Sequence, residues 1–189
     1  VERLGSVRVD LLGGTIDLPP INLVLPDVVT LNLATSLRAR AALSPMDEPG
    51  VRFVSKDYNE EKYFQASDFS DAAFREGRFK QFEFVARMLA YFQVTKGVRV
   101  ELASGSPPGA GLGGSSAMGV TLYSALSEWC GHTLNSGEDR HLAVRRTQGI
   151  ESIILDKGPA GYQDYFPALF GGILALKACP GEVQVEQLY

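Results

Sequence analysis

Ser-Pro-Pro-Gly-Ala-Gly-Leu-Gly-Gly-Ser-Ser-Ala, at residues 106–117, is the stretch around which this chain is organised, and it holds four glycines and two prolines. Residues 98–103, just before it, alternate apolar and charged side chains, which is typical of a half-buried strand. Residues 118–130, just after it, carry apolar side chains at helical spacing. The sequence therefore predicts a strand, a glycine-rich loop and a helix, in that order.

This order has a chemical use. Glycines let the backbone turn sharply and let a ligand approach without a Cβ in the way. The first turn of a helix has N–H groups without internal partners, and the helix dipole adds partial positive charge there. Such an end can bind phosphate oxygens. Ser115 and Ser116 could cap the helix, face a phosphate or ligate a magnesium ion.

Other interpretations of the loop compete with this one. A glycine-rich turn that only caps a helix is the simplest. Gly109, Gly111 and Gly114 also fit the dinucleotide pattern G-x-G-x-x-G, and Glu128 has the spacing of the ribose-binding acid. However, Glu128 falls inside an apolar helical pattern, whereas that acid should end a second strand. A Walker loop is excluded because no Gly-Lys-Ser/Thr follows.

Composition sets the broad class. The chain has 189 residues, 45% of them hydrophobic, which is enough for one sizeable domain with a core. A net charge of −4 argues against general affinity for nucleic acid. No apolar run is long enough to span a bilayer, and no signal peptide opens the sequence. Two cysteines without metal-ligand spacing favour free thiols, so we expect a cytoplasmic protein without a membrane partner.

The remaining pattern predicts alternating strands and helices. Ser136 and Asp139 form the signature of a capping box, so a helix is expected to begin there. Residues 57–77 are polar and aromatic by turns and remain unassigned. The expected strands cover 4–12, 28–34, 37–43, 51–55, 98–103, 172–178 and 183–188, and the expected helices cover 79–94, 118–130 and 136–154.

The glycine-rich loop resembles the phosphate-binding motif of the GHMP kinases, a family named for galactokinase, homoserine kinase, mevalonate kinase and phosphomevalonate kinase. The prolines, the Gly-Leu-Gly core and the Ser-Ser-Ala end are all present in order. The resemblance implies that the loop cradles the phosphates of ATP, and that the region after residue 57 covers the nucleotide. The residues it assigns to the phosphates are Pro108, Gly109, Ala110, Gly111, Leu112, Gly113, Gly114, Ser115 and Ser116.

A second resemblance lies in residues 8–20, which are similar to the first motif of the GHMP sugar kinases. The branch most similar includes heptose 7-phosphate kinase and the kinase domain of fucokinase. It implies that Gly13 and Gly14 shape a sugar-binding loop, that Asp17 binds the sugar, and that Arg8 stands beside the catalytic aspartate. By residue type alone, Asp17 could equally stabilise its own turn. Galactokinases usually have Glu in place of Gly14, which argues against galactose.

A third resemblance covers residues 158–172, which are similar to the family segment running from a glycine turn through Gln-Asp to Phe-Gly-Gly. There Asp164 is the catalytic acid, although an Asp in this position could also cap a helix. Glu151 stands where the family has its metal-binding glutamate, and otherwise it would be a solvated surface residue. Magnesium favours a carboxylate together with phosphate oxygens, so Ser116 and Glu151 are the expected metal ligands.

Together, the three resemblances imply an ATP- and Mg²⁺-dependent kinase for a hydroxyl of a sugar or sugar phosphate. The implied fold is α+β, a largely antiparallel sheet with helices on one side, with residues 1–189 as the N-terminal, ATP-binding domain. The family's C-terminal domain is absent, so we expect weak or no activity unless that domain or a second chain supplies the rest. The alternatives are a non-catalytic nucleotide-binding or regulatory module, and a kinase for a non-sugar alcohol, which the Gly13–Asp17 loop disfavours.

Overall fold

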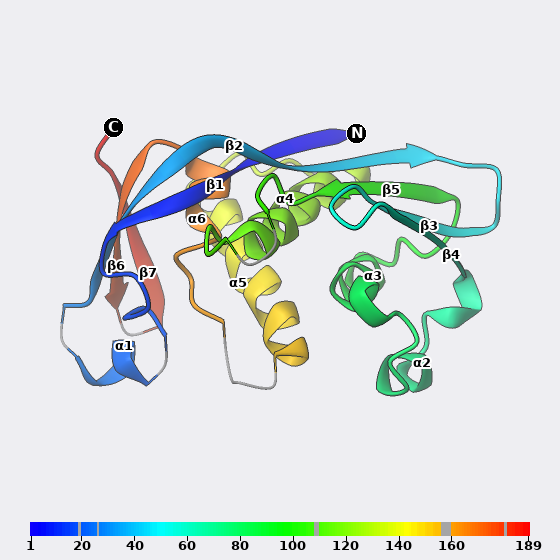
Figure 1. Cartoon of the computed structure of the whole chain (residues 1–189), viewed down its shortest axis with the longest axis horizontal. Coiled ribbons are helices and arrows are strands. Elements are labelled where there is room, and N and C mark those ends of the chain that lie inside the picture. Colours follow the sequence, from blue (N-terminus) through cyan, green and yellow to red (C-terminus); the bar gives the residue numbers. More distant parts are fainter. Residues whose placement is uncertain (19, 26, 108–109, 156–159, 180) are drawn as a thin grey trace.

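The computed structural model describes residues 1–18, 20–25, 27–107, 110–155, 160–179 and 181–189. It contains one seven-stranded sheet, with the helices gathered on one of its faces (Figure 1). The strand order is β4-β3-β5-β2-β6-β7, and β1 also pairs with β2. Every pairing is antiparallel except that of β3 with β5, so the expected α+β fold with a largely antiparallel sheet is confirmed.

The elements have the following bounds. The strands are β1 (Glu2–Leu12), β2 (Val29–Pro45), β3 (Gly50–Ser55), β4 (Glu60–Gln65), β5 (Val98–Ala103), β6 (Ile173–Cys179) and β7 (Glu182–Gln187). The helices are α1 (Ile21–Val24), η1 (Ala66–Asp68), α2 (Asp71–Arg75), η2 (Lys80–Phe82), α3 (Glu83–Tyr91), α4 (Gly114–Trp129), α5 (Gly137–Ile154) and α6 (Phe166–Phe170). Among the described residues, no helix combines the length and the hydrophobicity that crossing a membrane requires.

The core lies between the sheet and the helices. On β5 the apolar residues Val98, Val100 and Leu102 are buried, and the charged residues between them face the other way. This is the period-two pattern of a strand with one face in the core. Helix α4 contacts β1, β2, α3, α5 and α6 and buries residues on most of its circumference. A helix that is apolar nearly all round is expected at the centre of such a layer.

Strand β2 determines where the glycine-rich loop lies. One of its edges pairs with β1, and the other pairs with β6 through residues 29–33 and with β5 through residues 40–45. Between these two pairings the sheet opens at residues 34–39. The chain leaves β5 at this opening, and Gly105 packs so closely there that a Cβ would overlap the carbonyl oxygen of Arg38. The glycine-rich loop therefore emerges at the split in the sheet.

Strand β1 is irregular opposite the same split. Its register against β2 shifts between Ser6 and Arg8, where the partners change from Arg38 to Ala34. Irregularities of this kind re-aim side chains and are frequent beside active sites. The backbone N–H of Arg8 donates to the carbonyl oxygen of Leu112 at 3.3 Å, which ties β1 to the glycine-rich loop.

The structure corrects several predicted boundaries. Residues 28–34 and 37–43 are not two strands but parts of the single strand β2, which stays extended through the polar residues Thr35 and Ser36. The helix predicted at 79–94 is shorter. Lys80 has a φ of 49°, outside the right-handed helical region, and the 3-10 turn η2, which begins at this residue, precedes α3. Helix α4 starts before residue 118, and the unassigned residues 57–77 supply β4, η1 and α2.

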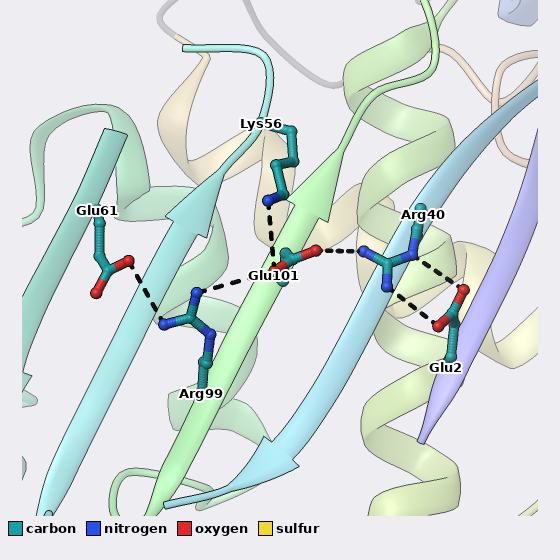
Figure 2. A network of polar contacts seen from close by, with 6 residues as sticks. All are labelled: Glu2, Arg40, Lys56, Glu61, Arg99 and Glu101. Atoms are coloured by element: carbon teal, nitrogen blue, oxygen red, sulfur yellow. Dashed lines mark hydrogen bonds and ion pairs between the residues drawn. The ribbon is translucent and has the colours of Figure 1, made fainter. Parts of the chain in front are cut away.

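The face of the sheet opposite the helices is covered by ion pairs (Figure 2). Arg40 on β2 pairs with Glu2 on β1 at 3.0 Å and with Glu101 on β5 at 2.6 Å. Lys56 also pairs with Glu101, and Arg99 pairs with Glu61 on β4. Positive and negative side chains alternate across the strands, which favours cross-strand pairing and keeps this face polar.

Candidate active site

The glycine-rich loop turns directly into α4. Gly113 is the N-cap, with a φ of 67°, and no side chain caps this helix end. The first helical hydrogen bond runs from the N–H of Ala117 to the carbonyl oxygen of Gly113 at 2.9 Å. The N–H groups of the preceding first turn therefore lack helical partners. Of the roles considered for Ser115 and Ser116, capping this helix is excluded, while Pro108 and Gly109 lie outside the described residues.

A cavity of about 370 Å³ lies against this loop. All residues from Ala110 to Ser116 line it, and Asp164 contributes a wall. Beyond the loop it reaches Asp57 and Tyr58, in the turn between β3 and β4, and Phe84 on α3. The cavity is thus lined by polar groups at the helix N-terminus and at Asp164, and by the aromatic side chains of Tyr58 and Phe84. The expectation that the region after residue 57 covers the nucleotide is consistent with this lining.

Asp164 faces the glycine-rich loop. A Cβ on Gly113 would lie 2.7 Å from Cγ of Asp164, so the absence of a side chain at Gly113 lets the carboxylate approach the loop. Arg8 pairs with Asp164 at 2.6 Å between Nη2 and Oδ1, and with Asp10 at 3.0 Å. Its Nη1 also donates to the carbonyl oxygen of Gly111. Arg8, only 6% exposed, thus links the carboxylate, strand β1 and the loop.

The single guanidinium of Arg8 pairs with two carboxylates, those of Asp10 and Asp164. Burial raises the pKa of Asp164 to about 6, against the lowering effect of Arg8, and the charges of Asp17, Asp10 and Glu151 raise it further. Burial also raises the pKa of Asp10. A carboxyl group whose pKa lies near the working pH is suited to accept a proton. The local excess of negative charge also favours a cation at this end of the cavity.

Glu151, near the end of α5, is buried rather than solvated. Its Oε2 accepts hydrogen bonds from Oγ of Ser116 at 3.0 Å and from Oη of Tyr165 at 2.5 Å. Burial raises the pKa of Glu151, while these hydrogen bonds lower it. The surface interpretation of Glu151 is therefore wrong, and the structure brings together Ser116 and Glu151 from two different helices.

The donors at this point fit a magnesium ion. A serine hydroxyl and a carboxylate are hard oxygen ligands, and Mg²⁺ typically takes one or two protein carboxylates and completes its shell with waters and phosphates. Within the ranges that the structure describes, no three His, Cys, Asp or Glu residues gather as a closed metal cage. An open pair of oxygen donors beside the glycine-rich loop would suit a metal that arrives with a nucleotide.

The loop after β1 lies on the other side of Asp164. Oδ2 of Asp17 accepts hydrogen bonds from the N–H groups of Tyr162 at 2.7 Å and of Gln163 at 3.1 Å. Asp17 is only 1% exposed, and its Oδ1 has no hydrogen-bond partner among the described residues. Asp17 therefore stabilises a segment 145 residues away in the sequence rather than its own turn. That it also binds a sugar stays a prediction.

The glycines of the same loop have different surroundings. Gly13 has a φ of 74°, and a Cβ there would overlap the carbonyl oxygen of Val29, which belongs to the backbone of β2. At Gly14 a Cβ would lie 3.2 Å from Oδ2 of Asp10. Gly13 thus meets a strict requirement of the fold, and Gly14 lets the loop approach the carboxylate that pairs with Arg8.

Gly13→Ala is expected to lower the free energy of unfolding by about 3 kcal/mol, because a left-handed φ and a clash with backbone act together. Gly77→Ala is the matched control: Gly77 has a φ of 66°, but nothing lies within 4 Å of its added Cβ. The control should lose only about 1 kcal/mol. Urea unfolding of both variants measures the difference, and equal losses would contradict this account of Gly13.

Several residues of the site were missed by the sequence. Asp10 stands two positions after Arg8, and residues two apart on a strand share a face, so this spacing was a usable signal. Tyr165 adjoins Asp164, but nothing local shows that its hydroxyl reaches Glu151. Asn32, whose Nδ2 donates to the carbonyl oxygen of Gln163, and Tyr58, which lines the cavity, carry no local signal either. Their positions depend on contacts between segments that are distant in the sequence.

Comparison with known proteins gives a family and a fold. Residues 80–172 match the family model described as the GHMP kinases N terminal domain. A D-glycero-D-manno-heptose 1-phosphate kinase from Bacteriodes thetaiotaomicron superposes with a TM-score of 0.79 at 22% identity. The mevalonate kinase of Methanococcus jannaschii gives 0.75 at 16% identity, and a Lactococcus lactis galactokinase gives 0.68 at 14%. No curated protein matches by sequence.

These alignments cover 100%, 100% and 98% of this chain. They cover 60%, 56% and 46% of the three solved chains, in the same order. The chain therefore spans about half of the proteins that it resembles. At such identities the likeness establishes the fold, which the three share although their names give different substrates.

Proposed function

Because residues 80–172 of this chain match the model of the GHMP kinases N terminal domain, we propose that the chain is the ATP-binding part of a small-molecule kinase. It would transfer the γ-phosphate of ATP to a hydroxyl of a sugar or sugar phosphate. The proposal is supported above all by one observation, the carboxylate of Asp164 packed against Gly113 in the wall of the same cavity. A helix end suited to bind phosphate and a basic carboxylate then adjoin the same space.

The nucleotide would lie along the cavity. Its phosphates would accept hydrogen bonds from the first-turn N–H groups of α4 and from the loop before it, where the helix dipole favours negative charge. Its base would lie at the other end, against Tyr58 and Phe84. This orientation places the terminal phosphate beside Asp164 rather than beside the aromatic residues.

Asp164 would act on the acceptor hydroxyl. An alcohol is a weak nucleophile until its proton has an acceptor, and a carboxylate within hydrogen-bond reach provides one. Arg8 keeps this carboxylate ionised and in place through their ion pair. Most of the rate enhancement would come from positioning and from neutralisation of charge, as in other phosphoryl transfers.

Ser116 and Glu151 would hold the magnesium ion that accompanies ATP. Bound there, the ion would neutralise charge on the phosphate oxygens and orient them. Tyr165 donates to the same carboxylate oxygen of Glu151 and so fixes its direction. These three side chains come from α4, α5 and the segment before α6, so the metal ligands also tie the helices together.

A sugar acceptor is supported by the loop after β1 and by the name of one structural neighbour, a heptose 1-phosphate kinase. The mevalonate kinase has a similar TM-score, so a non-sugar alcohol is the second candidate within the enzyme class. Asp17 adjoins the Asp164 segment, where the acceptor must lie. Gly14 adjoins Asp10, which shares Arg8 with Asp164. A screen of sugars, sugar phosphates and mevalonate with the full-length protein distinguishes the two candidates.

The remaining alternative is a nucleotide-binding module without catalysis. It predicts binding of ATP but no phosphoryl transfer to any acceptor by the full-length protein. The chain spans 60% of the heptose 1-phosphate kinase, so we expect the isolated chain to bind nucleotide with weak or no turnover. Phosphoryl transfer by the full-length protein, measured by coupled ADP release, separates the kinase from the module.

Glu151→Gln is expected to weaken binding of the magnesium–nucleotide complex about tenfold or more, because the metal loses its carboxylate ligand. Binding of ATP in excess chelator should change less than twofold, since the glutamine preserves the shape of the side chain. Titration calorimetry with and without magnesium measures both. Glu128→Gln, near the end of α4, is the control and should change neither the affinity with magnesium nor the affinity without it. An unchanged magnesium dependence in Glu151→Gln would remove Glu151 from the metal site.

A further inference from the structure

The segment from Tyr162 to Tyr165 is held at nearly every position by a side chain from elsewhere in the fold. Asp17 accepts from the N–H groups of Tyr162 and Gln163, and Nδ2 of Asn32 donates to the carbonyl oxygen of Gln163 at 3.1 Å. Both backbone polar groups of Gln163 are therefore used, directly before Asp164. The hydroxyl of Tyr165, the residue directly after Asp164, donates a hydrogen bond to the carboxylate of Glu151.

We propose that Asn32 and Asp17 are positioning residues for Asp164. Asp17 holds the backbone N–H of Gln163 and Asn32 holds its carbonyl oxygen, and together they place the carboxylate of Asp164 against the phosphate loop. The proposal rests on the function proposed above and deepens it, because it assigns the accuracy of the site to residues that need not touch the substrate. The two side chains and the peptide of Gln163 together form a unit, the Gln163 clamp.

The two side chains come from rigid surroundings. Asn32 is fully buried near the start of β2, where its neighbours Leu31 and Leu33 pair with both β1 and β6. Asp17 is held in turn by Asn22, whose Nδ2 donates to the backbone carbonyl oxygen of Asp17 at 2.6 Å. The clamp therefore connects Asp164 to the central strand of the sheet and to the loop after β1.

Close packing leaves the clamp little freedom. A Cβ on Gly161 would lie 2.8 Å from Cγ of Asp17, so the backbone before Tyr162 passes directly over the carboxylate. On the opposite side of Asp164, Gly113 is equally close to the carboxylate of Asp164 itself. Asp164 thus has a fixed backbone behind it and the phosphate loop in front of it.

As a purely structural feature, the clamp would lower the stability of the fold. Oδ1 of Asn32 and Oδ1 of Asp17 are both buried without a hydrogen-bond partner among the described residues. Each such atom carries a desolvation penalty that no hydrogen bond offsets. An apolar residue in place of Asn32 would fill the same strand position without this penalty. Costs of this kind are commonly retained where they support function.

The expected benefit is accuracy. A displacement of about 1 Å at a reacting group can lower the rate on the order of a hundredfold. Loss of the clamp should therefore reduce turnover and leave nucleotide binding unchanged, because none of its hydrogen bonds involves the phosphate loop. A purely structural role would instead lower stability and reduce every activity in parallel.

Asn32→Leu in the full-length protein tests the proposal. Leucine removes the donor to Gln163, which is destabilising, together with the unpartnered Oδ1, which is stabilising, so the two effects oppose each other and the variant should still fold. We expect kcat with the best acceptor from the screen to fall about 10–100-fold, while KM for ATP changes less than twofold. Ser127→Ala, a buried polar-to-apolar change at the far end of α4, is the control and should leave kcat unchanged.

Asp17 gives an independent second test. Asp17→Asn retains an oxygen that can accept from both N–H groups, whereas Asp17→Ala retains none, so kcat should decrease only partly in the first and strongly in the second. If Asp17 served only to bind the acceptor, both variants would raise KM for the acceptor and leave kcat alone.

The outcomes are distinguishable. A wild-type protein that transfers phosphate to no acceptor overturns the proposed function, and with it the positioning role. An active wild type whose Asn32→Leu variant keeps its kcat within twofold overturns only the positioning role. Parallel losses of folded protein, nucleotide binding and turnover in Asn32→Leu and Asp17→Ala would also overturn it, in favour of a structural role.

Discussion

Asp164→Asn is expected to abolish nearly all phosphoryl transfer and, at the same time, to stabilise the fold. Loss of a carboxylate that accepts the proton of the acceptor hydroxyl should lower kcat about a thousandfold in the full-length protein. Nucleotide affinity should stay within about twofold, because in the proposed orientation Asp164 would lie on the acceptor side of the terminal phosphate. Arg8 keeps Asp10 as its partner in the variant, so no buried charge loses its only counterion.

The stabilisation follows from the raised pKa of Asp164, about 6 against 3.8 for an unperturbed group. When the folded-state pKa of an acid is raised, ionisation destabilises the folded state at pH values above that pKa. The destabilisation disappears below the unfolded pKa, where both states are protonated. Asp164→Asn should therefore gain about 3 kcal/mol at about pH 7.5 and almost nothing at about pH 3.

Asp139→Asn is the control, with the opposite sign expected. The side chain and backbone N–H of Ser136 hold the pKa of Asp139 below its usual value, so its ionised form stabilises the fold above the unfolded pKa and loses this effect as the pH falls. Thermal unfolding of both variants at the two pH values measures the contrast. An Asp164→Asn variant that retains its kcat, or that is destabilised at neutral pH, would contradict the role given to this carboxylate.

Arg8→Met is expected to cost about 3–5 kcal/mol of folding free energy, the usual consequence of removing one partner from a buried ion pair. The change leaves Asp164 and Asp10 without their cation and the carbonyl oxygen of Gly111 without its donor. Turnover should fall together with stability. Arg8→Lys should recover only part of both, because one ammonium group cannot reproduce the contacts of the guanidinium.

Arg40→Met is the matched control, because Arg40 also pairs with two carboxylates, Glu2 and Glu101 (Figure 2). Its side chain is 33% exposed, against 8% for Arg8, and solvent screens its ion pairs. We expect Arg40→Met to cost about 1 kcal/mol or less. Guanidinium unfolding compares the two variants, and equal losses would show that Arg8 is not an internal link of the site.

Most of the strands and helices could be predicted because their signals are local. The alternation of residues 98–103 gives β5, and the capping box at Ser136 is present at the start of α5. The boundaries failed where tertiary contacts override local preference. Residues 35–36 separated two predicted strands, but Oγ1 of Thr35 donates to the carbonyl oxygen of Val7, and β2 continues through them.

The sequence by itself determined the strand, the glycine-rich loop and the helix that follows it, because turns, helix starts and alternation depend on neighbouring residues. It also carried the motifs by which Arg8, Ser116, Glu151 and Asp164 were proposed for the site. Only the tertiary structure decided that Glu151 is buried against Ser116, and that Asp17 and Asn32 hold the peptide before Asp164. Hydrogen bonds between segments 35 to 146 residues apart leave no local pattern, since they depend on how the whole sheet and its helices bring those segments together.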